Sequence, residues 1–219
     1  MNDIVIINGS PKAKDSVSGI FIDKIGEITG DKIPVYQATQ FIKMESAAPA
    51  IADILSARIL LIVFPLYVDS LPAPLIKVLG MIEQVAGNAQ GRLPRVYAIC
   101  NCGFFEADHT RLALDMVENF SARAGLPWGY GIGVGGGAFF AAQSKNMAKG
   151  GPAAAAYAAL RELCEAMRSE GAEGRNIFIT PKIPRFLYKS IAEAGWRRAA
   201  GKYGAAKFLN ARPHGQPPS

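Results

Sequence analysis

Residues 4–18 read Ile4-Val5-Ile6-Ile7-Asn8-Gly9-Ser10-Pro11-Lys12-Ala13-Lys14-Asp15-Ser16-Val17-Ser18, an apolar run that leads directly into a turn rich in serine and lysine. The run predicts a short strand, and a strand that is apolar at every position is typical of a sheet covered on both faces. A helical pattern begins near residue 17, where the turn ends. We therefore expect a strand–loop–helix unit, the first repeat of an α/β fold.

The rest of the chain repeats this unit. Four more apolar runs follow, and stretches long enough for a helix separate them. The expected strands lie near residues 4–7, 33–36, 59–64, 96–100 and 130–134, and the expected helices near 17–29, 47–57, 73–86, 107–124 and 152–170. Strands that alternate with helices form parallel sheets with right-handed crossovers. The sequence thus predicts a three-layer, doubly wound sheet of five parallel strands.

Composition excludes several other classes of protein. The chain has 219 residues, of which half are hydrophobic and 19% are charged, as in one globular α/β domain. Cys100, Cys102 and Cys164 fit no disulfide framework, and two histidines are too few for a His/Cys zinc cluster. We see no signal peptide and no apolar run near the roughly 20 residues that span a bilayer. We expect a cytoplasmic protein without a metal site.

Basic residues are concentrated near the C-terminal end. Residues 1–176 carry 16 basic and 17 acidic residues, whereas residues 177–219 carry eight basic residues and a single acidic one, Glu193. Such a shift in charge indicates a change in organisation. We expect residues 1–176 to form the α/β domain and residues 177–219 to form a basic helical extension that is not an independent domain.

The extension has a helical pattern over residues 184–209. One stripe recurs at helical spacing, and a basic set accompanies it: Tyr188, Ala192, Trp196, Ala199 and Tyr203, with Arg185, Lys189, Arg198 and Lys202. The pattern is open to three interpretations. The helix packs on its own domain or on a dimer mate, it binds an anionic membrane surface or an acidic protein, or it recognises the extra phosphate of NADPH. We expect no nucleic-acid partner, because the main domain shows no matching basic face.

The first loop offers the groups that bind a phosphate. Ligands of open parallel sheets bind where strands end and helices begin. There, Gly9 permits a tight turn, serine hydroxyls and a lysine follow, and the helix N-terminus adds free N–H groups: Ser10, Lys12, Ser16, Val17 and Ser18. An ordinary turn with a serine N-cap is the alternative. The GxGxxG pattern at Gly131, Gly133 and Gly136 lies at the end of the last expected strand and is a chance match, because residues 133–138 are rich in glycine and are expected to form a flexible loop.

The loops after the third and fourth expected strands offer a place for a flat ring. A rigid apolar ledge follows the third strand, made by Pro65, Leu66, Tyr67 and Val68. Tyr67 as a cap on the core is the alternative. After the fourth strand, hydrogen-bonding groups for the edge of a ring come from Asn101, Cys102 and Gly103, and Phe104 can stack. The residue pattern favours Cys100 and Cys102 as core thiols over redox centres.

Two motifs in register resemble one known family. Asn8-Gly9-Ser10-Pro11-Lys12 with Ser16-Val17-Ser18, and Pro65-Leu66-Tyr67-Val68-Asp69-Ser70-Leu71-Pro72, resemble the NADPH-dependent FMN reductases among the flavodoxin-like proteins, over about residues 3–170. The resemblance implies a flavodoxin-like fold, FMN as cofactor and NAD(P)H as co-substrate. It makes the first loop the phosphate site and Pro65 to Val68 the ring contacts, with Asn101, Cys102 and Gly103 as weaker candidates.

Two departures from the family pattern stand out. Lys12 stands where arginine is common, which keeps the charge but loses the bidentate fork. The four-cysteine run of the related iron–sulfur flavoproteins is missing, so we expect no iron–sulfur cluster.

The resemblance also implies an activity. The expected protein is an oxidoreductase that takes hydride from NAD(P)H and passes electrons to a flavin, a quinone or another small acceptor, and no catalytic acid or base is assigned. A homodimer or a higher homo-oligomer is implied as well. Two other functions remain open: an FMN-binding electron-transfer or sensor protein without turnover of its own, and a protein with an empty pocket whose basic extension mediates assembly.

Overall fold

The computed structural model describes residues 3–12, 15–44, 46–89, 91–169 and 174–211. The chain divides into two compact units between Pro181 and Lys182. The first unit therefore continues five residues beyond the expected boundary at residue 176. The last eight residues of the expected extension, 212–219, lie outside the described residues, as do residues 13 and 14 of the first loop.

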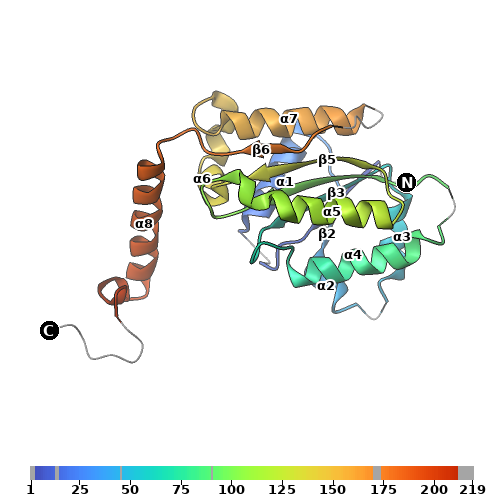
Figure 1. The fold of residues 1–219 in the computed structure, drawn as a ribbon, viewed down its shortest axis with the longest axis horizontal. Helices are drawn as coiled ribbons and strands as arrows, with labels where there is room; N and C mark the ends of the chain where they lie inside the picture. The colour runs from blue at the N-terminus through green and yellow to red at the C-terminus, as the bar shows by residue number, and fades with distance from the viewer. Residues whose placement is uncertain (1–2, 13–14, 45, 90, 170–173, 212–219) are drawn as a thin grey trace. The chain divides into compact units, whose positions relative to one another are not determined.

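The first unit is built on a parallel sheet with the strand order β2-β1-β3-β4-β5-β6 (Figure 1). The strands are β1 (Ile4–Asn8), β2 (Val35–Gln37), β3 (Ile59–Pro65), β4 (Arg95–Asn101), β5 (Trp128–Val134) and β6 (Ile177–Ile179). The prediction of five strands was wrong by one, because β6 was assigned to the extension. β6 is three residues long and pairs with the edge of β5, so its local pattern is too short to indicate a strand.

The winding of the sheet reverses next to β1. The chain passes from β1 to β2 on one side and then returns to β3 on the other side of β1, before it continues outward to β4, β5 and β6. In such sheets the crevice at the carboxyl ends of the two strands around the reversal is the usual ligand site. This geometry brings together the loops that follow β1, β3 and β4.

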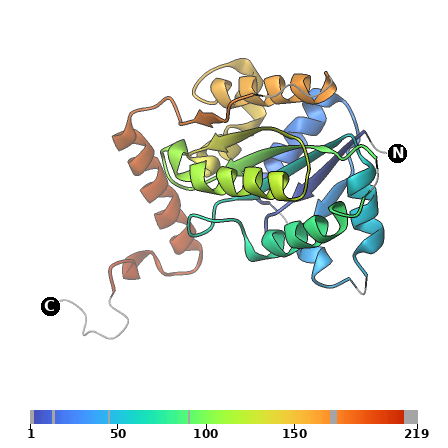
Figure 2. The same ribbon diagram turned by 45° about the vertical axis from the view of Figure 1, so that its right-hand side comes forward.

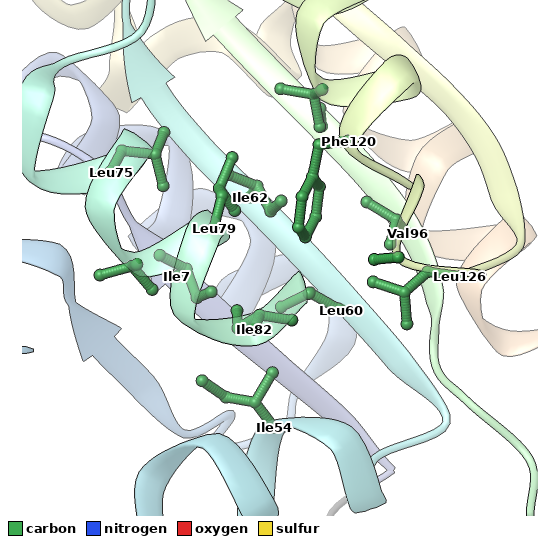
Figure 3. Close-up of a cluster of buried hydrophobic side chains, with 14 of the residues drawn as sticks. Ile7, Ile54, Leu60, Ile62, Leu75, Leu79, Ile82, Val96, Phe120 and Leu126 are labelled. Atoms are coloured by element: carbon green, nitrogen blue, oxygen red, sulfur yellow. The ribbon is translucent and has the colours of Figure 1, made fainter. Parts of the chain in front are cut away.

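Helices cover both faces of the sheet (Figures 1 and 2). One face carries α1 (Val17–Thr29) and α7 (Ala154–Arg168), and the opposite face carries α3 (Ala48–Ser56), α4 (Ala73–Ala86) and α5 (Arg111–Arg123). Along β1 the side chains alternate between two buried clusters, with Val5 and Ile7 in one and Ile4 and Ile6 in the other. Figure 3 shows part of the first cluster, where α4 and Phe120 of α5 pack on β1, β3 and β4.

Several short elements were not expected from the sequence. They are α2 (Ala38–Phe41), α6 (Gly137–Ala142) and the 3₁₀ turns η1 (Ala107–Thr110) and η2 (Ser144–Lys149). The expected helix over 107–124 is thus η1 followed by α5, and α6 begins inside the glycine-rich segment that was expected to be a loop. A periodic pattern needs more residues than these elements contain.

The alternating glycines of β5 allow α5 and η1 to approach the sheet. A Cβ atom on Gly131 would lie 2.7 Å from Cδ2 of Leu114, and one on Gly133 would overlap the side chain of Thr110. Glycine in a strand often marks such a close approach. Packing therefore explains this part of the GxGxxG pattern without a dinucleotide.

The second unit contains α8 (Arg185–Lys202) and the 3₁₀ turn η3 (Ala206–Phe208), consistent with the helical pattern over residues 184–209. The structure describes α8 throughout, and none of its side chains is buried. Among the described residues there is no helix whose length and apolar character would let it cross a membrane.

Candidate functional site

The first loop is ordered by its own polar side chains. Asn8, the last residue of β1, is buried, and its Oδ1 accepts a hydrogen bond from the Ser10 N–H at 3.0 Å. Ser10 Oγ accepts from the Lys12 N–H at 3.3 Å. Ser16 is the N-cap of α1, and its Oγ accepts from the Gly19 N–H at 2.9 Å. The serine N-cap raised as an alternative is therefore present.

Three buried hydroxyls of this loop retain the capacity to donate. Ser10, Ser16 and Ser18 each accept a hydrogen bond through Oγ, Ser18 from Asn101 Nδ2 at 2.9 Å. Among the described residues none accepts a hydrogen bond from these hydroxyls, so their hydrogens are available to a ligand. The N–H groups of Val17 and Ser18 are in the first turn of α1 and have no acceptor within the helix. The loop thus presents several donors and the positive end of a helix dipole.

Lys12 bends back over the loop. Its Nζ donates a hydrogen bond to the carbonyl oxygen of Asp15 at 2.8 Å, and its side chain is exposed. Asp15 has a φ of 51°, a conformation that a non-glycine residue rarely adopts. The hydrogen bond to Asp15 therefore holds the Lys12 cation near the N-terminus of α1.

Glycine is needed at position 9 because neighbouring side chains pack closely against it, and not because its φ is positive. It is not among the described residues with positive φ. A Cβ atom at this position would lie 2.7 Å from Cδ2 of Leu75 and 2.8 Å from Cβ of Phe64. The expected role of Gly9 in permitting a tight turn is replaced by this steric reason, which no pattern in the sequence reveals.

The second loop folds into a two-residue hairpin that projects into solvent. Tyr67 and Ser70 exchange backbone hydrogen bonds of 3.0 and 3.1 Å, and between them Val68 and Asp69 have φ values of 50° and 56°. Two successive residues with positive φ define a turn that glycine and asparagine usually occupy, so a β-branched valine is strained there. The Val68 side chain is 97% exposed and the Tyr67 side chain is half exposed. Strain of this kind is concentrated at functional sites.

Pro65 and Leu66 lie at the base of this hairpin. Pro65 is the last residue of β3, and the Leu66 N–H donates to the carbonyl oxygen of Asn101 at 2.7 Å. Both side chains are half-buried. The second and third loops are therefore joined through their backbones.

Asn101 links the three loops. It is buried at the end of β4, and its Nδ2 donates to Ser18 Oγ at 2.9 Å and to the carbonyl oxygen of Phe64 at 3.0 Å. Both amide hydrogens are thus engaged within the protein. Asn101 holds α1 against the ends of β3 and β4, and its Oδ1 lies next to Gly137 of α6.

The thiols near the site are protonated at neutral pH. Cys102 is buried, and its Sγ lies 3.7 Å from the carbonyl oxygens of Phe104 and Glu106. Burial raises the pKa of the Cys102 thiol, and it raises the pKa of Cys100 well above its ordinary value. A reactive cysteine needs a lowered pKa. The interpretation of these residues as buried thiols is confirmed.

An aromatic surface follows the third loop. Gly103 is exposed, and the half-exposed ring of Phe104 lies against the imidazole of His109, with ring centroids 4.4 Å apart. His109 Nε2 is 3.9 Å from a carboxylate oxygen of Glu106. This arrangement offers a flat apolar face beside a glutamate and a histidine side chain.

Backbone groups of the segment after β5 complete the cluster, and sequence reasoning missed them. The N–H of Gly136 donates to the carbonyl oxygen of Phe104 at 2.5 Å, and the N–H of Gly137 donates to that of Cys102 at 2.7 Å. A Cβ on Gly137 would lie 3.2 Å from both Val17 Cγ1 and Asn101 Oδ1. The run of three glycines was the available signal, because it permits such close contacts.

Together, the sheet order and the cluster of loops at the winding reversal define a flavodoxin-like α/β fold. Comparison with known proteins agrees at the level of the fold alone. No family model matches the sequence, and no curated protein matches it.

Three solved structures illustrate the likeness. A general stress protein 14 from Treponema denticola, in complex with FMN, superposes with a TM-score of 0.53 and 12% identity over 75% of this chain and 99% of that one. An NADPH-quinone reductase from P. pentosaceus gives 0.51 and 16% over 76% and 96%. The Trp repressor binding protein from Bacillus subtilis gives 0.51 and 16% over 61% and 84%.

Proposed function

We propose that this chain binds FMN at the carboxyl ends of β1, β3 and β4 and acts as an NAD(P)H-dependent oxidoreductase, with a flavin, a quinone or another small molecule as electron acceptor. The observation that carries the proposal is that three buried serine hydroxyls of the first loop and the start of α1 have hydrogens with no described acceptor, and two of them, Ser16 and Ser18, lie at the N-terminus of α1. Two proteins of the same fold add support, since one is in complex with FMN and the other is called an NADPH-quinone reductase.

The chemistry of the first loop suits a phosphate monoester. Such a group carries about two negative charges and accepts hydrogen bonds only. Ser10, Ser16 and Ser18 supply hydroxyl donors, Val17 supplies a backbone N–H at the helix N-terminus, and Lys12 supplies a cation. Serine hydroxyls whose hydrogens were already bonded within the protein would have argued against this ligand.

The proposed ring contacts come from the other two loops. Pro65, Leu66, Tyr67 and Val68 form the base and the tip of the strained hairpin, and Cys102 and Gly103 follow the end of β4. We assign Asn101 a positioning role, because its amide hydrogens bind Ser18 and Phe64. Its loss would release Ser18 and thereby weaken the phosphate site.

When bound, FMN supplies the capacity to accept a hydride and to deliver electrons, and the protein supplies binding and orientation. Buried serines hold the phosphate end at the winding reversal. The half-exposed rings of Tyr67 and Phe104 leave room for a second planar molecule to pack. Because these contacts are apolar and open, they set little restriction on the acceptor. A cytoplasmic location is part of the same proposal.

An absorption spectrum tests the proposal directly. The purified protein should show flavin bands as isolated or after FMN is added, and NADPH should bleach them rapidly without oxygen. A bound flavin that NADPH reduces only slowly would favour the electron-transfer or sensor alternative. Protein that takes up no FMN would overturn the proposal.

The phosphate loop is tested by the double variant S10A/K12A. Removal of a hydroxyl donor and a cation should weaken FMN binding roughly 100-fold, because hydrogen bonds to charged groups contribute about 1.5–3 kcal/mol each. The matched control is S56A/K77A, which removes an exposed serine at the end of α3 and an exposed lysine within α4, both outside the three loops of the proposed site. Flavin titration of both variants measures the difference, and unchanged affinity in S10A/K12A would contradict the phosphate assignment.

We further propose a homodimer through the groove between α4 and α5. This groove has a volume of about 420 Å³ and is lined by apolar side chains that include the exposed Ile76 and Met116, with Glu83 and Arg123 paired at its rim. Apolar surface of this kind is usually covered. The variant I76D should lower the mass measured by light scattering, whereas an unchanged mass would place the contact elsewhere.

A further inference from the structure

The second unit exposes aromatic side chains that a soluble helix normally covers. Phe186 is 74% exposed, Trp196 is 70% exposed and Tyr203 is 87% exposed. Leu187, Ile191 and Leu209 are exposed as well. These large apolar side chains of residues 182–211 therefore form a surface that their own unit does not cover.

These apolar side chains do not share one face of α8. Leu187 and Trp196 are nine residues apart, which places them about 180° apart around the helix axis. A single flat protein surface cannot cover both sides of the helix. A surrounding layer of mixed polar and apolar character can do so.

Each exposed aromatic residue stands next to a cation in the sequence. Phe186, Trp196, Tyr203 and Phe208 are each adjacent to a lysine or an arginine. The Nζ of Lys207 lies 5.1 Å from the ring centroid of Phe208. Seven basic residues and one acidic residue occupy residues 182–211, and no described acidic residue pairs with Arg197, Arg198 or Lys202. The surface of residues 182–211 therefore attracts anions and presents exposed aromatic rings beside its cations.

We infer that the unit of α8 and η3 docks on an anionic lipid surface. Tryptophan and tyrosine favour the headgroup layer, and neighbouring lysine and arginine reach the phosphates while their stems stay in apolar surroundings. Nucleic acid would use the cations and rings, but it offers nothing to Leu187, Ile191 or Leu209. Lipid chains accept these aliphatic groups, and anionic headgroups complement the positive charge.

Vesicle binding by the full chain tests this inference. The probes are large unilamellar vesicles of phosphatidylcholine alone and of phosphatidylcholine with 30% phosphatidylglycerol. The protein should co-sediment with the anionic vesicles at least tenfold more strongly, and 0.5 M NaCl should reduce this binding because salt screens surface charge. In the variant W128F, Trp196 is the sole tryptophan, and its emission should shift to shorter wavelength on the anionic vesicles.

Charge-matched variants separate α8 from the rest of the chain. R197Q/R198Q should lower the partition onto anionic vesicles by roughly tenfold or more, since each cation near such a surface contributes several-fold. K77Q/R161Q removes the same charge from exposed positions on α4 and α7 and should bind as wild type does. Both variants should keep the thermal transition of the first unit.

Four outcomes overturn the inference. They are equal binding to both vesicle types, no binding at low salt, unchanged binding in R197Q/R198Q, and tighter binding to a single-stranded RNA than to anionic vesicles. A mass in lipid-free solution that falls in R197Q/R198Q, combined with no vesicle binding, assigns the surface to a second copy of the chain. Each result is independent of flavin, so it leaves the proposed activity untouched.

Discussion

Two regions of this chain treat apolar residues in opposite ways. In β3 every side chain from Ile59 to Phe64 is buried, and helices cover both faces of the sheet (Figures 1 and 2). In α8, over its whole described length, no side chain is buried although the helix contains Phe186, Ile191 and Trp196. The side chains of β3 are therefore covered within the sheet unit, whereas those of α8 are not covered within the C-terminal unit.

This difference distinguishes apolar side chains that stabilise the fold from apolar side chains that are available to bind a partner. Each large apolar side chain that is removed from water contributes about 1.5–3 kcal/mol, so the stability of the first unit is internal. The exposed rings of α8 gain nothing of this kind within their own unit, and such a gain requires another surface to cover them. Sequence changes in the two regions should therefore affect different measurements.

The largest contrast is expected from one substitution made in both regions. I62A, in the middle of β3, should lower the free energy of unfolding by about 4 kcal/mol, because it removes a fully buried side chain and leaves a cavity. I191A, at a half-exposed position in α8, should change it by less than about 0.5 kcal/mol. Urea unfolding of both variants gives the comparison. A large loss in I191A would mean that α8 is part of the folded core.

Two glycine-to-alanine variants compare a closely packed position with an open one. G9A should destabilise the protein by about 2 kcal/mol and weaken flavin binding, since the new Cβ would collide with Phe64 and Leu75 and displace the first loop. G80A in α4, where no atom lies within 4 Å of the new Cβ, should stabilise by about 0.5–1 kcal/mol. Thermal unfolding and flavin titration measure both effects. Equal behaviour of the two variants would contradict the steric reason for Gly9.

Long periodic segments made most of this fold predictable. Helices α1 and α4 begin and end where the sequence places them, because an apolar stripe and a clear start signal agree in each. β6 and α6 escaped prediction, since three and six residues carry too little pattern and depend on pairing with β5 or on close glycine contacts. Short elements are formed by tertiary contacts, which the local sequence does not encode.

The sequence indicates candidate residues for the proposed site but not the hydrogen bonds and backbone conformations that connect them. The positions of Ser10, Ser16 and Ser18 after a buried strand indicate a phosphate loop. Nothing in the sequence shows that Asn101 donates to Ser18 across 83 positions, or that Val68 adopts a positive φ. The first depends on the register between β3 and β4, and the second depends on the strain that the surrounding fold can hold.

A tyrosine at the sheet edge gives a smaller, pH-dependent effect. Tyr36 of β2 donates a hydrogen bond to Asp53 of α3 at 2.6 Å, and this bond, with burial, raises the pKa of Tyr36 to about 12. Because the folded-state pKa lies above the unfolded value near 10, the stabilisation is complete below pH 10 and is lost as the pH rises through 12. Y36F should cost about 1 kcal/mol at pH 8.

Unfolding measured between pH 8 and pH 12 checks this dependence. The difference between wild type and Y36F should shrink steadily above pH 10. Y203F is the control, because Tyr203 is almost fully exposed in the second unit and its loss should leave the stability curve parallel to that of wild type. A difference for Y36F that persists at pH 12 would mean that the stabilisation comes from packing.

The smallest effect on stability, with a separate effect on binding, is expected from G195A. Gly195 lies inside α8 with no atom within 4 Å of a new Cβ, so alanine fits and favours the helix by about 1 kcal/mol. The unfolding transition of the first unit should not move, because α8 contributes no buried side chain to it. If α8 must be helical to dock on lipid, a better helix former reduces the ordering that docking requires. The affinity of G195A for anionic vesicles should therefore rise a few-fold. An unchanged or lower affinity would show that α8 does not bind the lipid surface as a helix.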